Sequence, residues 1–222
     1  MIEVILEKIQ QALSFKKKNL ITVTNSDSVL SDEFRKIQTN IQFLSEGKEN
    51  QVYLMTAPGR REGTSTITAN SAVMMAEQKG KTLLIDANLR DPAIHRMFEL
   101  MNQVGLADVL VGNATIKQAI QPTEISNLDV ITSGLASANP TELLGSEKMA
   151  DLLKSVKDNY NMVLIDAPTL LKTTETRMLA TRCDGVILIL NRGKTGIDKT
   201  VEARKTLEFA QAKLVGTILN DK

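Results

Sequence analysis

A loop rich in glycine and small hydroxyl side chains is the first part of this sequence that suggests chemistry. It follows the apolar residues 52–55 and precedes a helical pattern of apolar residues. A strand, a glycine-containing loop and a helix in this order typically bind phosphate, because backbone N–H groups point at the anion from the start of the helix. In the pattern G-x-x-x-x-G-K-[ST], Gly63 is the last glycine and Ser65 supplies the Mg²⁺-binding hydroxyl. Thr64 stands where the lysine is expected, so the loop lacks its main positive charge.

Two aspartates are candidate partners of this loop, because each closes an apolar run typical of a buried strand. Asp86 ends the run LLID, and Asp166 ends the run VLID. Ligands of open α/β sheets bind beyond the carboxyl ends of the strands. A carboxylate in that position, next to a phosphate loop, can hold Mg²⁺ directly or through water. The two aspartates and the loop together predict a nucleotide site.

The elements that must position these residues alternate along the chain from residue 52 onward. This alternation predicts a mainly parallel sheet with helices on both faces. The apolar patterns predict strands at 52–56, 82–87, 128–132, 162–166, 185–190 and 214–219. They predict helices at 65–79, 92–100, 115–121, 146–158, 174–181 and 197–211.

The first thirty residues are predicted to form a separate arm, and residues 31–222 the main domain. Residues 1–15 carry apolar side chains at helical spacing, and residues 19–30 resemble an extended linker. Packing on its own domain, docking on a partner and contact with a membrane surface remain open for this first helix. A second helix is expected to start with Ser31 as its N-cap and to end at 47–50.

The composition excludes several classes of function. Forty-two per cent apolar and 24 per cent charged residues are ordinary for a globular protein, and the net charge of +1 gives no reason to expect a nucleic-acid partner. One cysteine, Cys183, rules out an internal disulfide and is typical of a reducing compartment. No apolar run approaches the roughly 20 residues of a membrane span, and the N-terminus is unlike a signal peptide. We therefore expect a cytoplasmic protein.

Six sequence blocks together resemble the bacterial tyrosine kinases of capsule and exopolysaccharide synthesis, a family related to the MinD and ParA ATPases. The blocks are TAPGRREGTST, LLIDANLRDP, GLADVLVG, NLDVITSG, NPTELLGSEKM and MVLIDAP. The resemblance implies a doubly wound P-loop NTPase fold that binds ATP or ADP with Mg²⁺. It also implies a cytoplasmic position beside a membrane polysaccharide co-polymerase, whose cytosolic tail activates the kinase.

The sequence differs from the family pattern at positions that the family uses for nucleotide binding and catalysis. Carried over residue by residue, the resemblance gives a nucleotide-binding set of Gly59, Arg60, Arg61, Glu62, Gly63, Thr64, Ser65 and Thr66. Arg61 replaces a glycine of the family, and Thr64 replaces its lysine. The second motif, Asp-x-Asp-x-Arg, gives a catalytic set of Asp86, Asn88 and Arg90, in which an amide replaces one carboxylate. The implied metal-binding set is Ser65, Asp86 and Asp166. Arg60 and Arg61 are either local substitutes for the lysine or solvated surface residues.

Two further family features are reduced or missing. The ring-forming motif Glu-x-x-Arg-x-x-Arg reads Asp32, Arg35 and Gln38 here. Family members end in a tyrosine cluster that neighbouring subunits phosphorylate, whereas the only tyrosines of this chain are Tyr53 and Tyr160, in or next to predicted strands.

These departures favour a weakened or inactive kinase that acts as a regulatory or scaffolding subunit. Such a protein is expected to bind ATP or ADP with Mg²⁺ weakly and to be a monomer or small oligomer. Its expected partners are the co-polymerase tail, which would bring it to the inner face of the membrane, and an active paralogous kinase. An active tyrosine kinase and a MinD/ParA-like ATPase are the alternatives.

Overall fold

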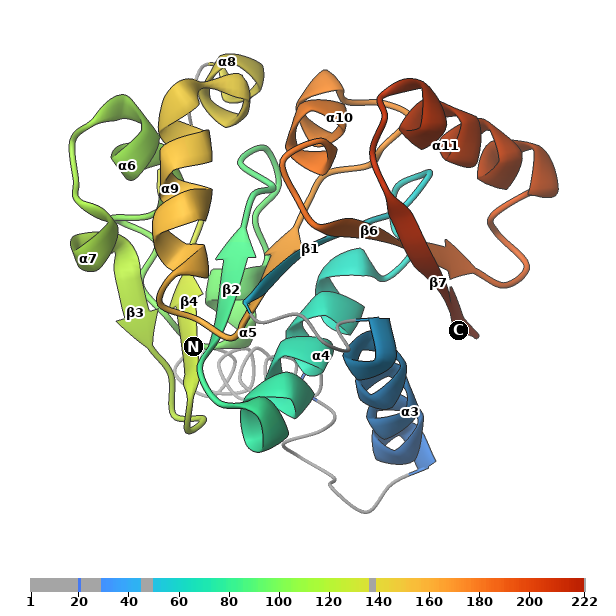
Figure 1. Ribbon diagram of the computed structural model, residues 1–222, viewed down its shortest axis with the longest axis horizontal. Helices are drawn as coiled ribbons and strands as arrows, with labels where there is room; N and C mark the ends of the chain where they lie inside the picture. The colour runs from blue at the N-terminus through green and yellow to red at the C-terminus, as the bar shows by residue number, and fades with distance from the viewer. Residues whose placement is uncertain (1–19, 21–28, 45–49, 136–138, 222) are drawn as a thin grey trace, which may run out of the picture.

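A seven-stranded sheet forms the centre of the computed structural model, which describes residues 20, 29–44, 50–135 and 139–221 (Figure 1). The strand order is β3-β4-β2-β5-β1-β6-β7. All neighbouring strands are parallel except β3 and β4, which are antiparallel. In sheet order, the strands are β3 Ile120–Pro122, β4 Leu128–Ile131, β2 Thr82–Asp86, β5 Met162–Asp166, β1 Gln51–Thr56, β6 Gly185–Asn191 and β7 Leu214–Asn220.

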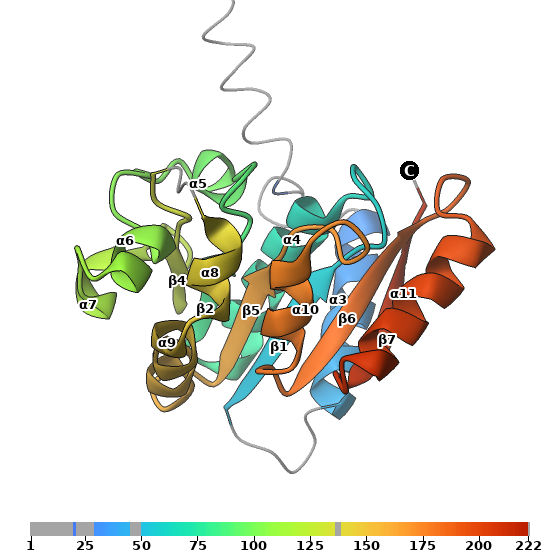
Figure 2. The ribbon, with the colours of Figure 1, turned by 90° about the horizontal axis from the view of Figure 1, so that it is seen from above.

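Helices cover both faces of this sheet and create two apolar cores (Figures 1 and 2). One face packs against α3 Val29–Leu44, α4 Thr64–Lys79 and α5 Ile94–Met97. The other packs against α6 Leu106–Val111, α7 Ile116–Ala119, α8 Pro140–Gly145, α9 Glu147–Lys157, α10 Thr174–Ala180 and α11 Ile197–Phe209. Successive side chains of a strand point to opposite faces. Accordingly Tyr53 and Met55 enter the first core, while Val52 and Leu54 enter the second.

The doubly wound parallel sheet is therefore confirmed, and the six predicted strands agree with the observed ones to within a residue or so at each end. Three short elements were not predicted: α6, α8 and the antiparallel strand β3, which occupies the end of the expected helix 115–121. The expected helix 92–100 is limited to Ile94–Met97. Elements of three to six residues show too little periodicity to be recognised, because packing stabilises them more than intrinsic propensity does.

The N-terminal region corrects one expectation. Helix α3 begins at Val29, so Ser31 lies inside the helix, where it is buried, and does not act as the N-cap. Phe34 and Ile41 of this helix are buried in the core, whereas Leu44 is 40% exposed. The predicted helix at 1–15, most of the linker at 19–30 and most of the expected helix end at 47–50 lie outside the described residues. The division into 1–30 and 31–222 stays a prediction.

Within the described residues, no helix combines the length and the apolar character that crossing a membrane requires.

Candidate functional site

The glycine-containing loop joins the central strand β1 to the N-terminus of α4, as the sequence predicts. Its last glycine, Gly63, is the N-cap of α4 and has a left-handed backbone with φ of 90°. The Gly63 carbonyl accepts the first helical hydrogen bond, from the N–H of Ile67, at 2.9 Å. A Cβ atom at Gly63 would collide with the side-chain amide of Asn220. Both the conformation and the close neighbour therefore require glycine here.

Arg61 occupies the position where the family has a second glycine. Its backbone is left-handed, with φ of 59°, although the residue is an arginine. This conformation costs a residue with a Cβ atom about 1–2 kcal/mol. The loop therefore carries local backbone strain at Arg61. The side chains of Arg60 and Arg61 are both exposed, and neither forms an ion pair with a described residue.

The two predicted aspartates meet beside this loop at the carboxyl edge of the sheet. Asp86 ends β2 and Asp166 ends β5, and the two residues are register partners on adjacent parallel strands. Asp166 is also the register partner of Met55, one residue before the end of β1. Three neighbouring strands therefore bring the loop, Asp86 and Asp166 to one place, as expected.

Asp86 is buried and its carboxylate is held by backbone N–H groups. It accepts hydrogen bonds from the N–H groups of Asn88, Ala93 and Ile94, each at 3.1 Å. Burial raises the pKa of Asp86 to about 6, and the three backbone donors offset only part of that rise. A carboxylate with such a pKa exchanges a proton near neutral pH.

Asp166 is equally buried but lacks comparable support. Neither of its carboxylate oxygens has a hydrogen bond of acceptable geometry within the described part of the chain. Burial, followed by the negative charge of Asp86, raises the pKa of Asp166 well above its ordinary value, and the nearby hydroxyl of Ser65 opposes this rise. Two buried, unpartnered oxygens next to a hydroxyl are suited to a cation.

These donors fit a Mg²⁺ ion that is bound together with phosphates, but they are too few to bind the ion with protein ligands alone. No cluster of three or more His, Cys, Asp or Glu side chains that could hold a metal exists among the described residues. Mg²⁺ bound with phosphates needs only one or two carboxylates, because phosphate oxygens and waters complete its octahedron. Ser65 and Asp166 would hold such an ion, together with Asp86 on the adjacent strand.

The other two residues of the second motif have different roles in the structure. Asn88 supports Asp86 through its backbone, and its side-chain oxygen accepts the N–H of Asp91 at 3.3 Å. The Arg90 Nε lies 3.0 Å from the Oε1 of Glu175, a buried residue at the start of α10. Burial raises the pKa of Glu175, but hydrogen bonds, including those from Arg90 and Thr141, leave it below its ordinary value.

Glu175 and Thr141 are site neighbours that sequence reasoning missed. The Thr141 hydroxyl donates to the Oε2 of Glu175 at 2.9 Å, so the carboxylate fixes Arg90 with one oxygen and anchors α8 with the other. Along the chain, Glu175 lies 85 residues from Arg90 and 34 residues from Thr141. No local pattern could have indicated contacts of that range.

Glu62 links the phosphate loop to the turn between β6 and α11, and this link was not predicted from the sequence. Its carboxylate is buried and accepts the N–H of Gly59 at 2.9 Å and the hydroxyl of Thr195 at 2.6 Å. The side-chain amide of Asn220, at the end of β7, donates to the Glu62 carbonyl at 3.0 Å. In the same turn, the Lys194 Nζ contacts carbonyl groups of the loop.

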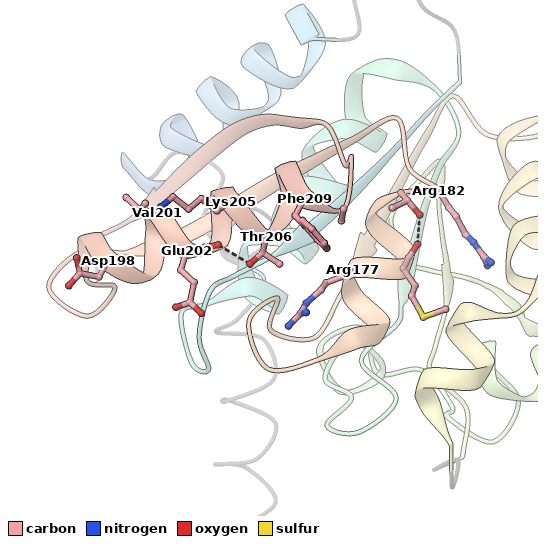
Figure 3. Close-up of a pocket in the computed structure, with 11 residues that line it drawn as sticks. Arg177, Arg182, Asp198, Val201, Glu202, Lys205, Thr206 and Phe209 are labelled. Carbon is pink, nitrogen blue, oxygen red and sulfur yellow. Dashed lines mark hydrogen bonds between the residues drawn. The ribbon is translucent and has the colours of Figure 1, made fainter.

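A cavity of about 750 Å³ adjoins the second half of the loop. Gly63, Thr66 and Asn220 line it, together with residues of α3, β6 and β7. Its volume is in the range of small-molecule sites. A separate groove of about 800 Å³ lies between α10 and α11 (Figure 3). None of the predicted site residues lines this second groove, so its position does not support a role in nucleotide chemistry.

Both tyrosines are inaccessible to a neighbouring subunit. Tyr53 is 1% exposed in β1. Tyr160 is 5% exposed, and its hydroxyl donates to the Asp129 carboxylate at 2.7 Å. Burial, followed by that hydrogen bond and the negative charge of Asp129, raises the Tyr160 pKa above its ordinary value. Neither side chain has the freedom of a phosphate acceptor in an extended tail.

A family match and related sequences agree with the resemblance seen in the sequence. The AAA domain family matches residues 62–214. The tyrosine-protein kinase YwqD of Bacillus subtilis (strain 168) is 38% identical over 206 residues, which cover 93% of this chain and 87% of that protein. The tyrosine-protein kinase ptk of Acinetobacter johnsonii is 34% identical over 209 residues, which cover 93% of this chain but 28% of that longer protein.

Solved structures agree with this result. The kinase domain of the Escherichia coli tyrosine kinase ETK superposes with a TM-score of 0.88 at 27% identity, covering 90% of this chain and 79% of that one. The septum site-determining protein MinD of Pyrococcus horikoshii OT3, complexed with Mg-ADP, has a TM-score of 0.66 at 24% identity, covering 76% and 69%. At that identity the MinD likeness shows the fold alone.

Proposed function

We propose that this chain, which belongs to the bacterial tyrosine-protein kinase family, is a regulatory or scaffolding subunit of capsule or exopolysaccharide synthesis with weak or absent kinase activity. The observation that carries the proposal is a loop between β1 and α4 that has the layout of a phosphate loop but a neutral residue, Thr64, at the position of its lysine. The loop lysine neutralises charge on the phosphates and on the group being transferred. A threonine can donate one neutral hydrogen bond and cannot replace that charge.

We also propose that the site binds ATP or ADP with Mg²⁺, but weakly. The Mg-ADP complex of MinD has the same fold, and the unpartnered oxygens of Asp166 suit a cation. When bound, the ion would neutralise phosphate charge. The N–H groups of the loop would bind phosphate oxygens, while Ser65 and Asp166 would orient the ion. If phosphate is transferred, Asp86, with its raised pKa, would accept the proton of the attacking hydroxyl. Asn88 offers an amide oxygen but no second negative charge.

The proposed partner is the cytosolic tail of a membrane polysaccharide co-polymerase, and an active paralogous kinase is a further candidate. Support comes from the Acinetobacter kinase, in which the matched region is little more than a quarter of a longer protein. We propose that a partner of this kind binds the present chain. Such an arrangement would place this cytoplasmic protein at the inner face of the membrane only while the partner holds it.

A phosphotransfer assay tests the proposal. The protein is incubated with ATP, Mg²⁺ and a synthetic tyrosine-containing acceptor, and phosphotyrosine is quantified by mass spectrometry. We expect no modification of Tyr53 or Tyr160, because both are buried, and little transfer to the acceptor. Thr64→Lys combined with Asn88→Asp is the matched variant in which transfer to the acceptor should rise. Stoichiometric phosphotyrosine formed by the unmodified protein would refute the proposed low activity.

A further inference from the structure

We propose that Lys194 supplies part of the positive charge that the phosphate loop lost at position 64, so that nucleotide binding is weakened but not abolished. This inference rests on the proposed nucleotide binding and deepens it, but it does not depend on whether the protein transfers phosphate. Lys194 lies in the turn between β6 and α11, more than 130 residues from the loop along the chain. No sequence pattern of the loop itself indicates this residue.

The ammonium group of Lys194 sits directly at the tip of the loop. Its Nζ donates hydrogen bonds to the carbonyl oxygens of Arg60, at 2.8 Å, and Arg61, at 2.7 Å. An ammonium group has three N–H donors, so these two bonds leave one free. Among the described residues, no carboxylate forms an ion pair with Lys194. The ammonium group therefore keeps its charge and one N–H donor for an anion, and the residue is exposed.

The turn that carries Lys194 is fixed to the same loop by a chain of hydrogen bonds. The N–H of Asn191 donates to the Thr195 hydroxyl at 2.8 Å, and that hydroxyl donates to the Glu62 carboxylate at 2.6 Å. Glu62 in turn accepts the N–H of Gly59 at the start of the loop. The turn is closed by the N–H of Lys194 itself, which donates to the Asn191 carbonyl at 3.1 Å. The cation is thus positioned before any ligand arrives.

The two arginines of the loop are poorer candidates for this role. Their side chains are exposed, and what the structure holds in place is their carbonyl groups, which Lys194 binds. A cation that is already positioned loses less side-chain entropy on binding phosphate than a free arginine does. Lys194 could instead serve only as a structural clamp on the loop, and the experiment must separate the two roles.

Calorimetric titrations with ATP, ADP and AMP in the presence of Mg²⁺ make this separation. We expect Lys194→Met to weaken ATP binding about tenfold or more, since a charge-assisted contact is lost. The loss should decrease from ATP to ADP to AMP, because fewer phosphates remain to meet the cation. Lys199→Met, an exposed lysine of α11, is the matched control and should leave all three affinities unchanged.

Rescue by a second charge completes the test. Thr64→Lys in the Lys194→Met background should restore ATP affinity, because it returns the charge without returning the clamp on the two carbonyls. An equal loss for all three nucleotides, without rescue, would show that Lys194 is only a clamp. Unchanged ATP affinity in Lys194→Met, or no ATP binding by the unmodified protein, would also overturn the inference. Phosphotransfer measured in parallel decides the proposed low kinase activity independently.

Discussion

At the scale of single residues, this site combines an intact framework with altered charges. Gly63, Ser65, Asp86 and Asp166 occupy the positions that a nucleotide site needs, and the structure brings them together. Thr64 and Asn88 are neutral where the family carries charge. Arg61 has a left-handed backbone, a conformation that favours glycine. The differences therefore concern the charge of the candidate site more than the fold.

Restoring the two charges together should strengthen nucleotide binding. For Thr64→Lys with Asn88→Asp, we expect ATP·Mg²⁺ affinity to rise roughly 10- to 100-fold, because a charge-assisted contact contributes about 1.5–3 kcal/mol. The carboxylate introduced by Asn88→Asp would still accept the N–H of Asp91, as the Asn88 side-chain oxygen does now. Isothermal titration calorimetry measures the effect. Thr64→Met plus Asn88→Asp is the control that lacks the positive charge at position 64. Nanomolar affinity in the unmodified protein would contradict the expectation of weak binding.

The buried carboxylates should make stability depend on pH in an unusual direction. Burial raises the pKa of Asp86 from 3.8 to about 6 and also raises that of Asp166. Between about pH 4 and pH 6 the folded protein therefore holds protons that the unfolded chain has released. Linkage requires that this contribution to stability is fully present below about pH 4 and is lost as the pH rises through 6.

Asp166→Asn should remove part of this loss, because the amide is nearly isosteric and never ionises. We expect the free energy of unfolding to match that of the unmodified protein near pH 4 and to exceed it near pH 7, by on the order of 1 kcal/mol. Urea denaturation at a series of pH values measures the difference. Asp198→Asn, at an exposed position of α11, is the control. Parallel pH curves for Asp166→Asn and the unmodified protein would show that Asp166 does not carry the effect.

Among the secondary-structure elements, helix α3 is fixed to α4 by a buried polar contact. The Gln38 side-chain amide is buried and donates to the Met74 carbonyl of α4 at 2.9 Å. Asp32 and Arg35 instead lie on the exposed side and pair with each other at 2.6 Å. The three positions that the ring motif would occupy therefore divide between two faces of the helix. Gln38 is not available to a neighbouring subunit.

Removing the Gln38 contact should weaken the attachment of α3. For Gln38→Ala, we expect the free energy of unfolding to fall by about 1–3 kcal/mol, because a buried hydrogen bond and its packing are lost. Chemical denaturation measures the change. Asn40→Ala is the matched control on the exposed side of the same helix and should stay within about 0.5 kcal/mol. Equal effects of the two substitutions would mean that α3 is held by its apolar residues alone.

At the scale of the whole molecule, the structure bears on assembly through the same helix. A ring of identical subunits repeats one heterologous interface, so each weakened contact recurs at every junction. Here the motif retains a single arginine, Arg35, already paired within its own helix. Exposed ion pairs contribute only about 0–1 kcal/mol each.

We therefore predict a monomer or small oligomer for the isolated protein. Light scattering coupled to size-exclusion chromatography, at micromolar protein concentration, measures the molar mass. The same measurement at high salt is the control for assembly through charge. A stable closed ring of many subunits would contradict the prediction and would indicate an interface outside the Asp32–Gln38 segment.

The fold class and the core of the candidate site follow from the amino-acid sequence alone. Apolar runs such as LLID and VLID specify central parallel strands, and an aspartate closing each run must lie at the carboxyl edge of the sheet. The missing lysine is equally plain, because the position of Thr64 within the loop is fixed by its neighbours Gly63 and Ser65. These features depend on local periodicity and spacing, which a chain carries without any tertiary information.

The tertiary structure brings residues that are distant in sequence to the candidate site. Lys194 and Thr195 reach the loop because β6 lies beside β1 in the sheet, and Glu175 reaches Arg90 because α10 begins near the end of β2. It also decided that Gln38 is buried and that both oxygens of Asp166 are without hydrogen-bond partners within the described residues. Burial and contact between segments far apart in sequence arise from packing, so no local pattern could have predicted them.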